Sequence, residues 1–154
     1  MERSKEENRR LITAYPFLLP RNVFTDALAA EAEDCEFTLL DEVPEGWRVT
    51  FGEQLCSELK TELEKAGRLE SYRIRQIKEK FGELRWYDFG GTAETDTIIE
   101  KYRKISRFTC ICCGKPAEYL TTSWIEPYCG DCIKLLPQYP EKVTRRTLPQ
   151  DRDS

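Results

Sequence analysis

Residues 71–91 read SYRIRQIKEKFGELRWYDFGG, two runs of β-branched and aromatic residues on either side of Phe81-Gly82. Two such runs joined by a short glycine-containing loop are typical of a β-hairpin, and Gly90-Gly91 ends the second run. Side chains alternate along a strand, so a two-residue loop places Ile77, Leu84 and Trp86 on one face. The other face is then expected to carry Tyr72, Ile74, Arg85, Tyr87 and Phe89.

Two segments with the apolar spacing of helices flank the predicted hairpin. In residues 47–66 the apolar side chains recur at every fourth position, as Phe51, Leu55, Leu59 and Leu63. In residues 94–107 they recur one turn apart, as Ile98, Tyr102 and Ile105, and Thr92 or Thr95 suits the N-cap. We therefore expect two helices that pack on the hairpin.

The ends of the chain carry weaker patterns. Residues 1–14 are predicted to form a short helix that ends before Pro16, and the following YPFLLPRN, between two prolines, is predicted to be an extended segment docked on the core. Residues 24–36 are also predicted to be helical. Residues 137–154 are rich in proline and charge and poor in apolar residues, which predicts a disordered tail.

Five of the seven cysteines lie between residues 110 and 132. Four of them form two C-x2-C pairs, Cys110/Cys113 and Cys129/Cys132, and the 15 residues between the pairs fit a four-cysteine zinc site. Two residues between ligands allow a tight turn to direct both sulfurs at one ion. We predict one structural Zn²⁺ per chain. Cys112 is predicted to be a non-ligand thiol, because adjacent residues rarely reach the same ion.

Four thiolates close the coordination shell, so the metal is predicted to be structural and not catalytic. Trp124, Ile125 and Tyr128 lie between the two cysteine pairs and are predicted to cover the metal and join the module to the core. A disulfide framework, a single iron in the same geometry and a redox dithiol are the open alternatives.

Composition argues against several classes of function. The chain of 154 residues contains no histidine, the commonest general base, and no glycine-rich phosphate loop, so we expect no enzyme. Cys56 has no histidine to activate it and is predicted to be a core residue. No apolar run approaches the roughly 18 residues that a membrane span requires, and no signal peptide is recognisable. A cytoplasmic protein without a membrane segment is expected, in a reducing compartment.

Charge is segregated along the chain. Residues 26–45 contain eight acidic and no basic residues, whereas residues 68–85 contain six basic and three acidic residues. One interpretation is that the two regions pair within the molecule, and the other is that they form a surface for a partner. Arginine and an aromatic ring suit a phosphate and a base. The candidate contacts are Arg73, Arg75, Lys78, Arg85 and Tyr87.

The string KEKFGELRWY at residues 78–87, preceded by Gly46-Trp47 and followed by the four cysteines, resembles a family of small bacteriophage and prophage proteins. Members of that family carry a Gly-Trp pair before a helix, a KEKFG-x-LR-[FW]-Y hairpin and a C-terminal cysteine module. The resemblance covers roughly residues 45–135. Some members have histidine at or beyond the last ligand, where this chain has Cys132. The resemblance implies a phage or prophage origin but no activity that transfers residue by residue.

The predicted fold is α+β: a small antiparallel sheet packed by the 47–66 and 94–107 helices, with a C-terminal zinc-ribbon or knuckle-like module. The predicted segments are a partly helical, acidic N-terminal segment at 1–44, a helix-hairpin-helix core at 45–108, a zinc module at 109–136 and the tail.

The predicted function is that of a non-enzymatic, zinc-containing binding protein of phage type in the cytoplasm of a bacterial host. It would bind a host protein or sequester a small anionic, nucleotide-like ligand, as in counter-defence. A nucleic-acid-binding zinc protein and a structural subunit of a larger assembly are the alternatives. The net charge of −4 counts against nucleic acid as the partner.

Overall fold

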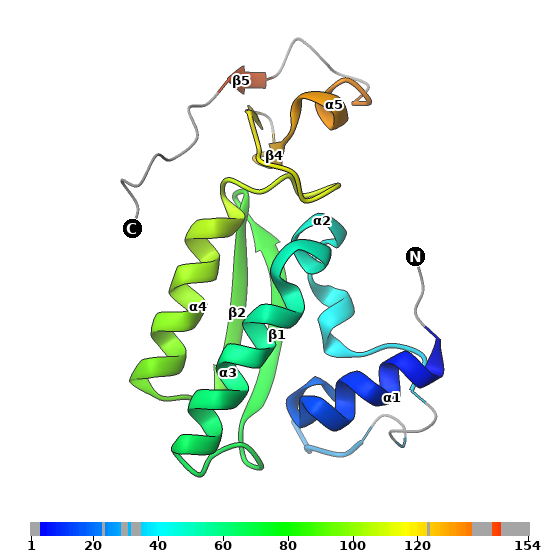
Figure 1. Ribbon diagram of the computed structural model, residues 1–154, viewed down its shortest axis with the longest axis vertical. Coiled ribbons are helices and arrows are strands. Elements are labelled where there is room, and N and C mark those ends of the chain that lie inside the picture. The colour runs from blue at the N-terminus through cyan, green and yellow to red at the C-terminus, as the bar shows by residue number, and fades with distance from the viewer. Residues whose placement is uncertain are drawn as a thin grey trace.

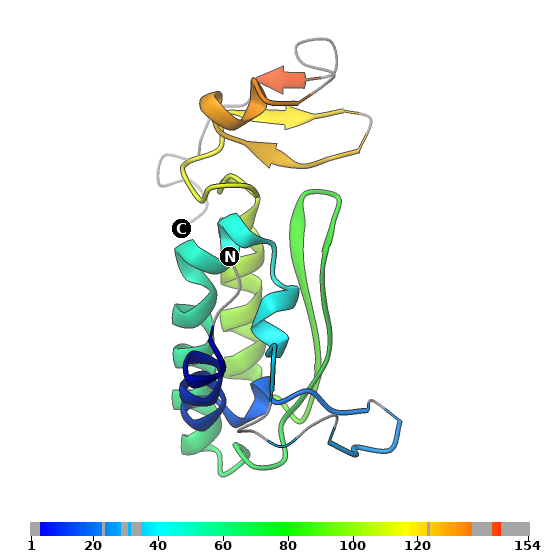
Figure 2. The same cartoon turned by 90° about the vertical axis from the view of Figure 1, so that its right-hand side faces the viewer.

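The computed structural model describes residues 4–22, 24–28, 31, 35–122, 124–136 and 143–145. It is an α+β protein in which helices lie on one face of a two-stranded antiparallel sheet (Figure 1). The cysteine-rich module lies at one end of these two layers, as Figure 2 shows from the side. No helix in the described part of the chain is both long and apolar enough to cross a lipid bilayer.

The predicted hairpin consists of β1 (Arg73–Lys80) and β2 (Glu83–Phe89), joined by Phe81-Gly82. Both loop residues have positive φ, 56° and 80°, which is the backbone of the two-residue turn that matches the twist of paired strands. Ile77 pairs with Trp86 on the buried face, as the alternation predicts.

The prediction that Tyr72 and Ile74 lie on the opposite face is wrong. A β-bulge between Ile74 and Gln76 adds one residue to β1, and this extra residue returns Ile74 to the buried face. Tyr72 precedes the strand and is fully buried in the core. The alternation rule fails here because a bulge breaks the period of two.

The predicted 47–66 helix is present, in three consecutive parts. These are α2 (Glu45–Trp47), a π-helical turn η4 (Arg48–Gly52) and α3 (Glu53–Lys65). The four predicted apolar residues and Trp47 are all buried. A strict four-residue repeat drifts around a helix of 3.6 residues per turn, and the wider π turn takes up part of that drift. The repeat therefore stays on one face.

The second predicted helix is α4 (Ala93–Ser106), capped by Thr92. Tyr102 is buried as predicted, but Ile105 is 39% exposed and does not belong to the packed stripe. Ser106 lies on the buried side instead, where its hydroxyl oxygen accepts a hydrogen bond from the Leu84 N–H of β2 at 2.9 Å. A polar residue is used there because the outer edge of β2 needs a hydrogen-bond partner.

The N-terminal segment begins with α1 (Lys5–Ala14), which ends before Pro16 as predicted. The YPFLLPRN segment docks on the core, but it begins with a 3-10 turn η1 (Pro16–Leu18) and is not fully extended. The described residues of 24–36 contain no helix, so that prediction is wrong for them. Arg21 and Leu28 pair across a loop instead. A short 3-10 helix η3 (Leu39–Glu42) leads into α2.

The main core contains buried residues of α1, η1, α2, η4, α3, β1, β2 and α4. A second, small buried cluster contains Cys110, Tyr128, Cys129 and Ile133. It belongs to the module formed by β3 (Tyr119–Thr121), β4 (Pro127–Tyr128) and α5 (Gly130–Ile133). β5 (Val143–Arg145), within the predicted tail, pairs with β3. The rest of 137–154 lies outside the described residues.

Candidate metal centre and basic hairpin face

The first cysteine pair lies on a tight turn that follows α4. The Cys110 N–H donates to the Lys115 carbonyl at 2.7 Å, and the Gly114 N–H donates to the Cys110 carbonyl at 3.0 Å. Gly114 has a φ of +87°, a conformation that side chains disfavour. The backbone therefore folds around the thiols of this pair, as a metal-binding knuckle requires.

The second pair lies between β4 and α5. Cys129 is the N-cap of α5, and its sulfur accepts the backbone N–H of Cys132 at 3.3 Å. An N–H that points at sulfur stabilises the thiolate form, which is the form that binds metal. The short helix thus orients Cys129 and places Cys132 one turn further along.

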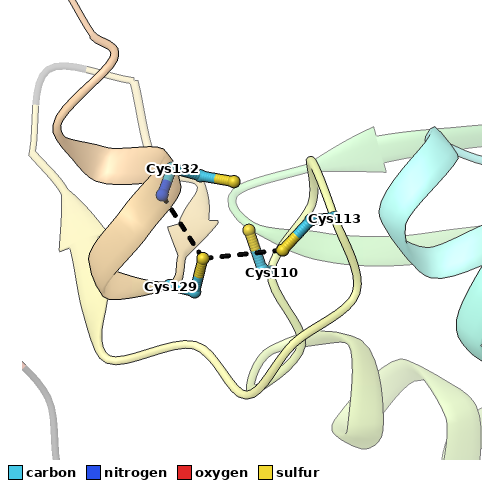
Figure 3. Close-up of side chains that lie close together, drawn as sticks. All are labelled: Cys110, Cys113, Cys129 and Cys132. Atoms are coloured by element: carbon cyan, nitrogen blue, oxygen red, sulfur yellow. Dashed lines mark hydrogen bonds between the residues drawn. The ribbon is translucent and has the colours of Figure 1, made fainter.

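The four predicted ligands converge from the two turns, as Figure 3 shows. Their sulfur atoms all lie within 4.8 Å of one another, and the sulfurs of Cys113 and Cys129 are 3.5 Å apart. Tetrahedral Zn²⁺ with Zn–S bonds of about 2.3 Å separates its sulfurs by about 3.8 Å. A disulfide would need about 2.05 Å, and all seven cysteines are free thiols. The arrangement is that of a four-sulfur metal site.

The protein itself favours ionisation of the Cys129 thiol over those of Cys113 and Cys132. Burial opposes the Cys129 thiolate, but the Cys132 N–H and the neighbouring Cys113 thiol lower its pKa to about 7. Burial raises the pKa of Cys113 and of Cys132. Four adjacent thiolates are stable together only when a cation compensates their charge. The donor set therefore fits a divalent metal better than a group of free thiols.

The other three cysteines do not belong to this centre. Cys112 is exposed and outside the converging group, which agrees with its prediction as a non-ligand. Cys56 lies on the buried side of α3, where burial raises the pKa of its thiol well above the usual range. Cys35 is also buried, near α1. The prediction of Cys56 as a core residue is confirmed.

The module is docked on the start of α2 by contacts too close for larger residues. The Gly46 N–H donates to the Ile111 carbonyl at 2.9 Å, and a Cβ on Gly46 would lie 2.2 Å from the Cys110 carbonyl oxygen. The Trp47 indole N–H donates to the Thr109 carbonyl at 2.9 Å. The Gly-Trp pair of the sequence thus fixes the metal-binding turn against the core.

The hairpin tip forms a second contact with the module. A Cβ on Gly82 would lie 3.2 Å from Ile125, which confirms the predicted joining role of Ile125. Tyr128 belongs to the buried cluster around Cys110 and Cys129, as predicted for a residue that covers the metal. Trp124 is exposed and donates to Glu126 at 2.7 Å, so its predicted role as a cover is wrong.

The strand register brings the predicted partner-binding residues together on the outer side of the hairpin. Lys78 pairs with Arg85, Gln76 with Tyr87 and Arg73 with Phe89. On that side of Figure 2 the only described segment beside the hairpin is the loop between Arg21 and Leu28. We call this surface the basic hairpin face, and it comprises Arg73, Arg75, Lys78, Lys80, Arg85, Tyr87 and Phe89.

The predicted site residues differ in whether their charged groups already have partners within the protein. The Arg73 guanidinium donates to the Asp26 carboxylate at 2.8 Å and to the carbonyls of Glu70 and Tyr72, so it holds the loop in place. The Arg75 guanidinium lies over the Phe89 ring, 4.6 Å from its centroid. Arg85 pairs with Glu83 at 3.3 Å. Part of the predicted charge pairing therefore occurs within the molecule, at Arg73 and Asp26.

Several residues of both surfaces are not evident from the sequence. Thr50 donates to the Gly114 carbonyl at 3.1 Å and helps to dock the module, but nothing in its local sequence indicates this contact. Phe89 was expected on this face but not as a candidate contact, and the alternation along the predicted hairpin also places Lys80 there. Phe24 is 93% exposed beside this face, although the predicted 24–36 helix concealed the loop that carries it.

The described part of the chain thus contains two candidate functional surfaces, a four-cysteine metal centre and a basic hairpin face. They are connected through the hairpin tip, where Gly82 meets Ile125. No protein-family model, curated protein sequence or solved structure matches this chain.

Proposed function

We propose that this chain is a non-enzymatic binding protein that captures a nucleotide-like anion on its basic hairpin face, while one structural Zn²⁺ holds the C-terminal module. The observation that carries the proposal is the register of the hairpin. It gathers basic and aromatic side chains on the side that the helices leave uncovered. The face is locally positive although the net charge of the chain is −4.

The donor set supports zinc as the metal. Four thiolates are soft ligands, and a tetrahedral four-sulfur site selects zinc or iron among common metals. A closed shell has no position for water or substrate, so the ion's role is to hold Cys110, Cys113, Cys129 and Cys132 together. We assign one Zn²⁺ per chain, and iron is the outcome that metal analysis would distinguish.

Charge and aromatic character support an anionic ligand. The basic hairpin face contains five basic residues, and the acids that lie against them are Asp26 and Glu83. Glu83 is itself paired with Arg103 of α4, which leaves the face positive. Tyr87 and Phe89 are 41% and 53% exposed on the same face. Guanidinium groups bind phosphate and exposed rings stack on bases, so a nucleotide matches both features.

Arg85 adds a further observation. Its Nε–H is buried and has no hydrogen-bond partner among the described residues. Buried donors are nearly always paired in folded proteins. The guanidinium is therefore not fully satisfied by Glu83, and a phosphate oxygen is a suitable additional partner after a small side-chain movement.

A single-stranded nucleic acid is the second candidate, because the basic residues are spread along the whole of β1. Eight strand residues span about 25 Å at about 3.3 Å per residue, which exceeds the length of one nucleotide. The acidic net charge counts against this candidate. An acidic host protein surface would use the same charges, and the resemblance to phage proteins remains a prediction.

The test is a titration of the isotope-labelled, zinc-loaded chain with ATP at low salt, followed by NMR. We expect shifts concentrated in residues 73–89. The Lys78→Gln/Arg85→Gln double variant should weaken ATP binding at least about tenfold, since each charge-assisted bond contributes about 1.5–3 kcal/mol. Lys60→Gln/Arg68→Gln, which removes two charges outside the face, is the matched control.

Three results of this titration would decide between the candidates. A ten-nucleotide oligo-dT that binds far more tightly than ATP, with a steep salt dependence, would favour the nucleic-acid candidate. Shifts that spare residues 73–89, or equal affinities of the double variant and its control, would contradict the assignment of the face. Absence of binding by both ATP and the oligonucleotide would contradict the proposed function.

A further inference from the structure

A pocket lies where the loop between Arg21 and Leu28 meets the bulged end of the hairpin. Its volume is about 230 Å³, and its lining includes Arg21, Phe24, Asp26, Arg73, Arg75 and Phe89. The pocket shares Arg73, Arg75 and Phe89 with the basic hairpin face, and the loop contributes Arg21, Phe24 and Asp26. It is too small to enclose more than a single nucleotide.

The loop is held in one shape by its own hydrogen bonds. The Asn22 side-chain oxygen accepts the backbone N–H groups of Phe24 and Thr25, at 2.8 and 3.0 Å. The Asn22 N–H donates to the Ala27 carbonyl at 2.8 Å. This compact turn leaves the Phe24 ring 93% exposed at the pocket wall. A large ring held in water beside a second exposed ring, that of Phe89, provides a stacking surface for a flat ligand.

The pocket is lined by three arginines and one acidic residue, Asp26. Its carboxylate lies 2.8 Å from the Arg73 guanidinium and 3.4 Å from that of Arg21. Three guanidinium groups and one carboxylate leave an excess of two positive charges. The N–H groups of Arg73 donate to the Asp26 carboxylate and to two backbone carbonyls, so Arg73 positions the loop. Arg21 and Arg75 keep N–H groups for a ligand, and Arg75 is presented by the bulge over Phe89.

We infer that this pocket binds a nucleoside monophosphate, with its phosphate at Arg21 and Arg75 and its base against the rings of Phe24 and Phe89. A phosphate dianion matches the excess charge, and guanidinium groups are its preferred partners. The inference rests on the proposed function, because it names the class of ligand and the pocket that would bind it. It adds the loop residues Arg21 and Phe24 to the site, which the hairpin alone does not contain.

The test is isothermal titration calorimetry of the full, zinc-loaded chain with 5′-AMP, ribose 5-phosphate and adenosine. We expect 5′-AMP to bind. Ribose 5-phosphate, which lacks the base, and adenosine, which lacks the phosphate, should each bind at least tenfold more weakly. Phe24→Ala and Arg75→Gln should each weaken 5′-AMP binding at least tenfold. Phe37→Ala and Arg68→Gln are the matched controls, and both should stay within twofold. Phe37 is 49% exposed, Arg68 is exposed, and neither residue lines the pocket.

The outcomes separate this inference from the proposed function. No detectable binding of 5′-AMP at millimolar concentration, equal binding of 5′-AMP and ribose 5-phosphate, or equal affinities of Phe24→Ala and Phe37→Ala would overturn the pocket assignment. If ATP binding still depends on Lys78 and Arg85 in those cases, the proposed function stands without the pocket. Because Phe24 is almost fully exposed, its substitution leaves the fold intact and the result remains interpretable.

Discussion

At the scale of single residues, three glycines determine how the metal centre meets the rest of the protein. Gly46 allows the Cys110 carbonyl to approach the start of α2, and Gly114 closes the first cysteine turn beside Thr50. Gly82 completes the hairpin turn and contacts Ile125. Two of these glycines belong to motifs that stand out in the sequence, Gly46-Trp47 and KEKFG, and their packing gives a physical reason for both motifs.

Gly46→Ala should destabilise the protein by about 2–3 kcal/mol, the usual size of an overpacking effect. The added Cβ would lie 2.2 Å from the Cys110 carbonyl oxygen, and backbone must move to relieve that contact. Urea unfolding of the zinc-loaded protein measures the effect. Gly67→Ala is the matched control, since Gly67 has a positive φ but no atom near the added Cβ, and it should cost about 1 kcal/mol. Equal losses would mean that the contact with Cys110 is unimportant.

Asp88 provides a pH-dependent test at the same scale. Burial raises the pKa of its carboxyl group, although the Tyr72 hydroxyl donates to it at 2.6 Å and opposes this shift. A carboxyl group whose pKa is higher in the folded than in the unfolded protein adds to the stability of the fold at low pH. Its contribution is fully present below the pKa of the unfolded protein, which is near 3.9. That contribution is lost as the pH rises through the folded pKa.

Asp88→Asn should therefore gain stability relative to the natural chain as the pH rises from about 4 to 7. Unfolding free energies of both proteins across this range give the difference, and the pH dependence of metal binding cancels because the two proteins share it. A difference that stays constant with pH would show that Asp88 ionises as freely in the folded as in the unfolded protein.

At the scale of elements, the sequence predicts those whose signals are local. The β-hairpin, the end of α1 before Pro16, the buried stripe through η4 and α3, and the N-cap at Thr92 all follow from nearby residues. The four-cysteine centre follows from ligand spacing, because C-x2-C turns impose their own geometry.

The features that the sequence does not predict depend on contacts between distant residues. The bulge at Arg75 and the burial of Ile74 reflect packing of β1 on the helices. The loop from Arg21 to Leu28 takes the place of the first part of the predicted 24–36 helix, because Asn22 and Asp26 bind backbone and charge partners there. Ser106 takes the buried position predicted for Ile105 because the edge of β2 needs an acceptor.

Thr92→Ala should cost about 1 kcal/mol, because the Thr92 hydroxyl accepts the Thr95 N–H at the start of α4. Thermal or urea unfolding measures the loss. Thr97→Ala is the matched control, because Thr97 lies within the same helix and is exposed, and it should stay within about 0.5 kcal/mol of the natural chain. If both substitutions have the same effect, the hydroxyl at Thr92 is not acting as a cap.

At the scale of the whole molecule, a large core and a small metal module meet at two places, the start of α2 and the hairpin tip. The main core has an extensive apolar interior, whereas the module buries only a few residues around Cys110, Tyr128 and Ile133. So small a cluster is not expected to remain ordered without its ion. The start of α2 and the hairpin tip are the places where loss of the ion would reach the core.

Chelation of the metal should therefore unfold the module locally and leave the main core folded. We expect faster amide hydrogen exchange throughout residues 110–136 and at Gly46, whose N–H donates to Ile111. Amides of Leu59 and Leu63 in α3 should keep their protection, because these residues are fully buried in the main core. Uniform loss of protection in α3 would show that the core also depends on the metal, and unchanged exchange at 110–136 would show that the module does not.

Whether Cys110, Cys113, Cys129 and Cys132 hold one zinc ion is measured by the metal-to-protein ratio of the freshly purified protein. We predict one zinc per natural chain, an unchanged ratio in Cys112→Ser and a strongly reduced ratio in Cys113→Ser, its immediate neighbour. A natural chain without zinc, or equal ratios in the two variants, would contradict it.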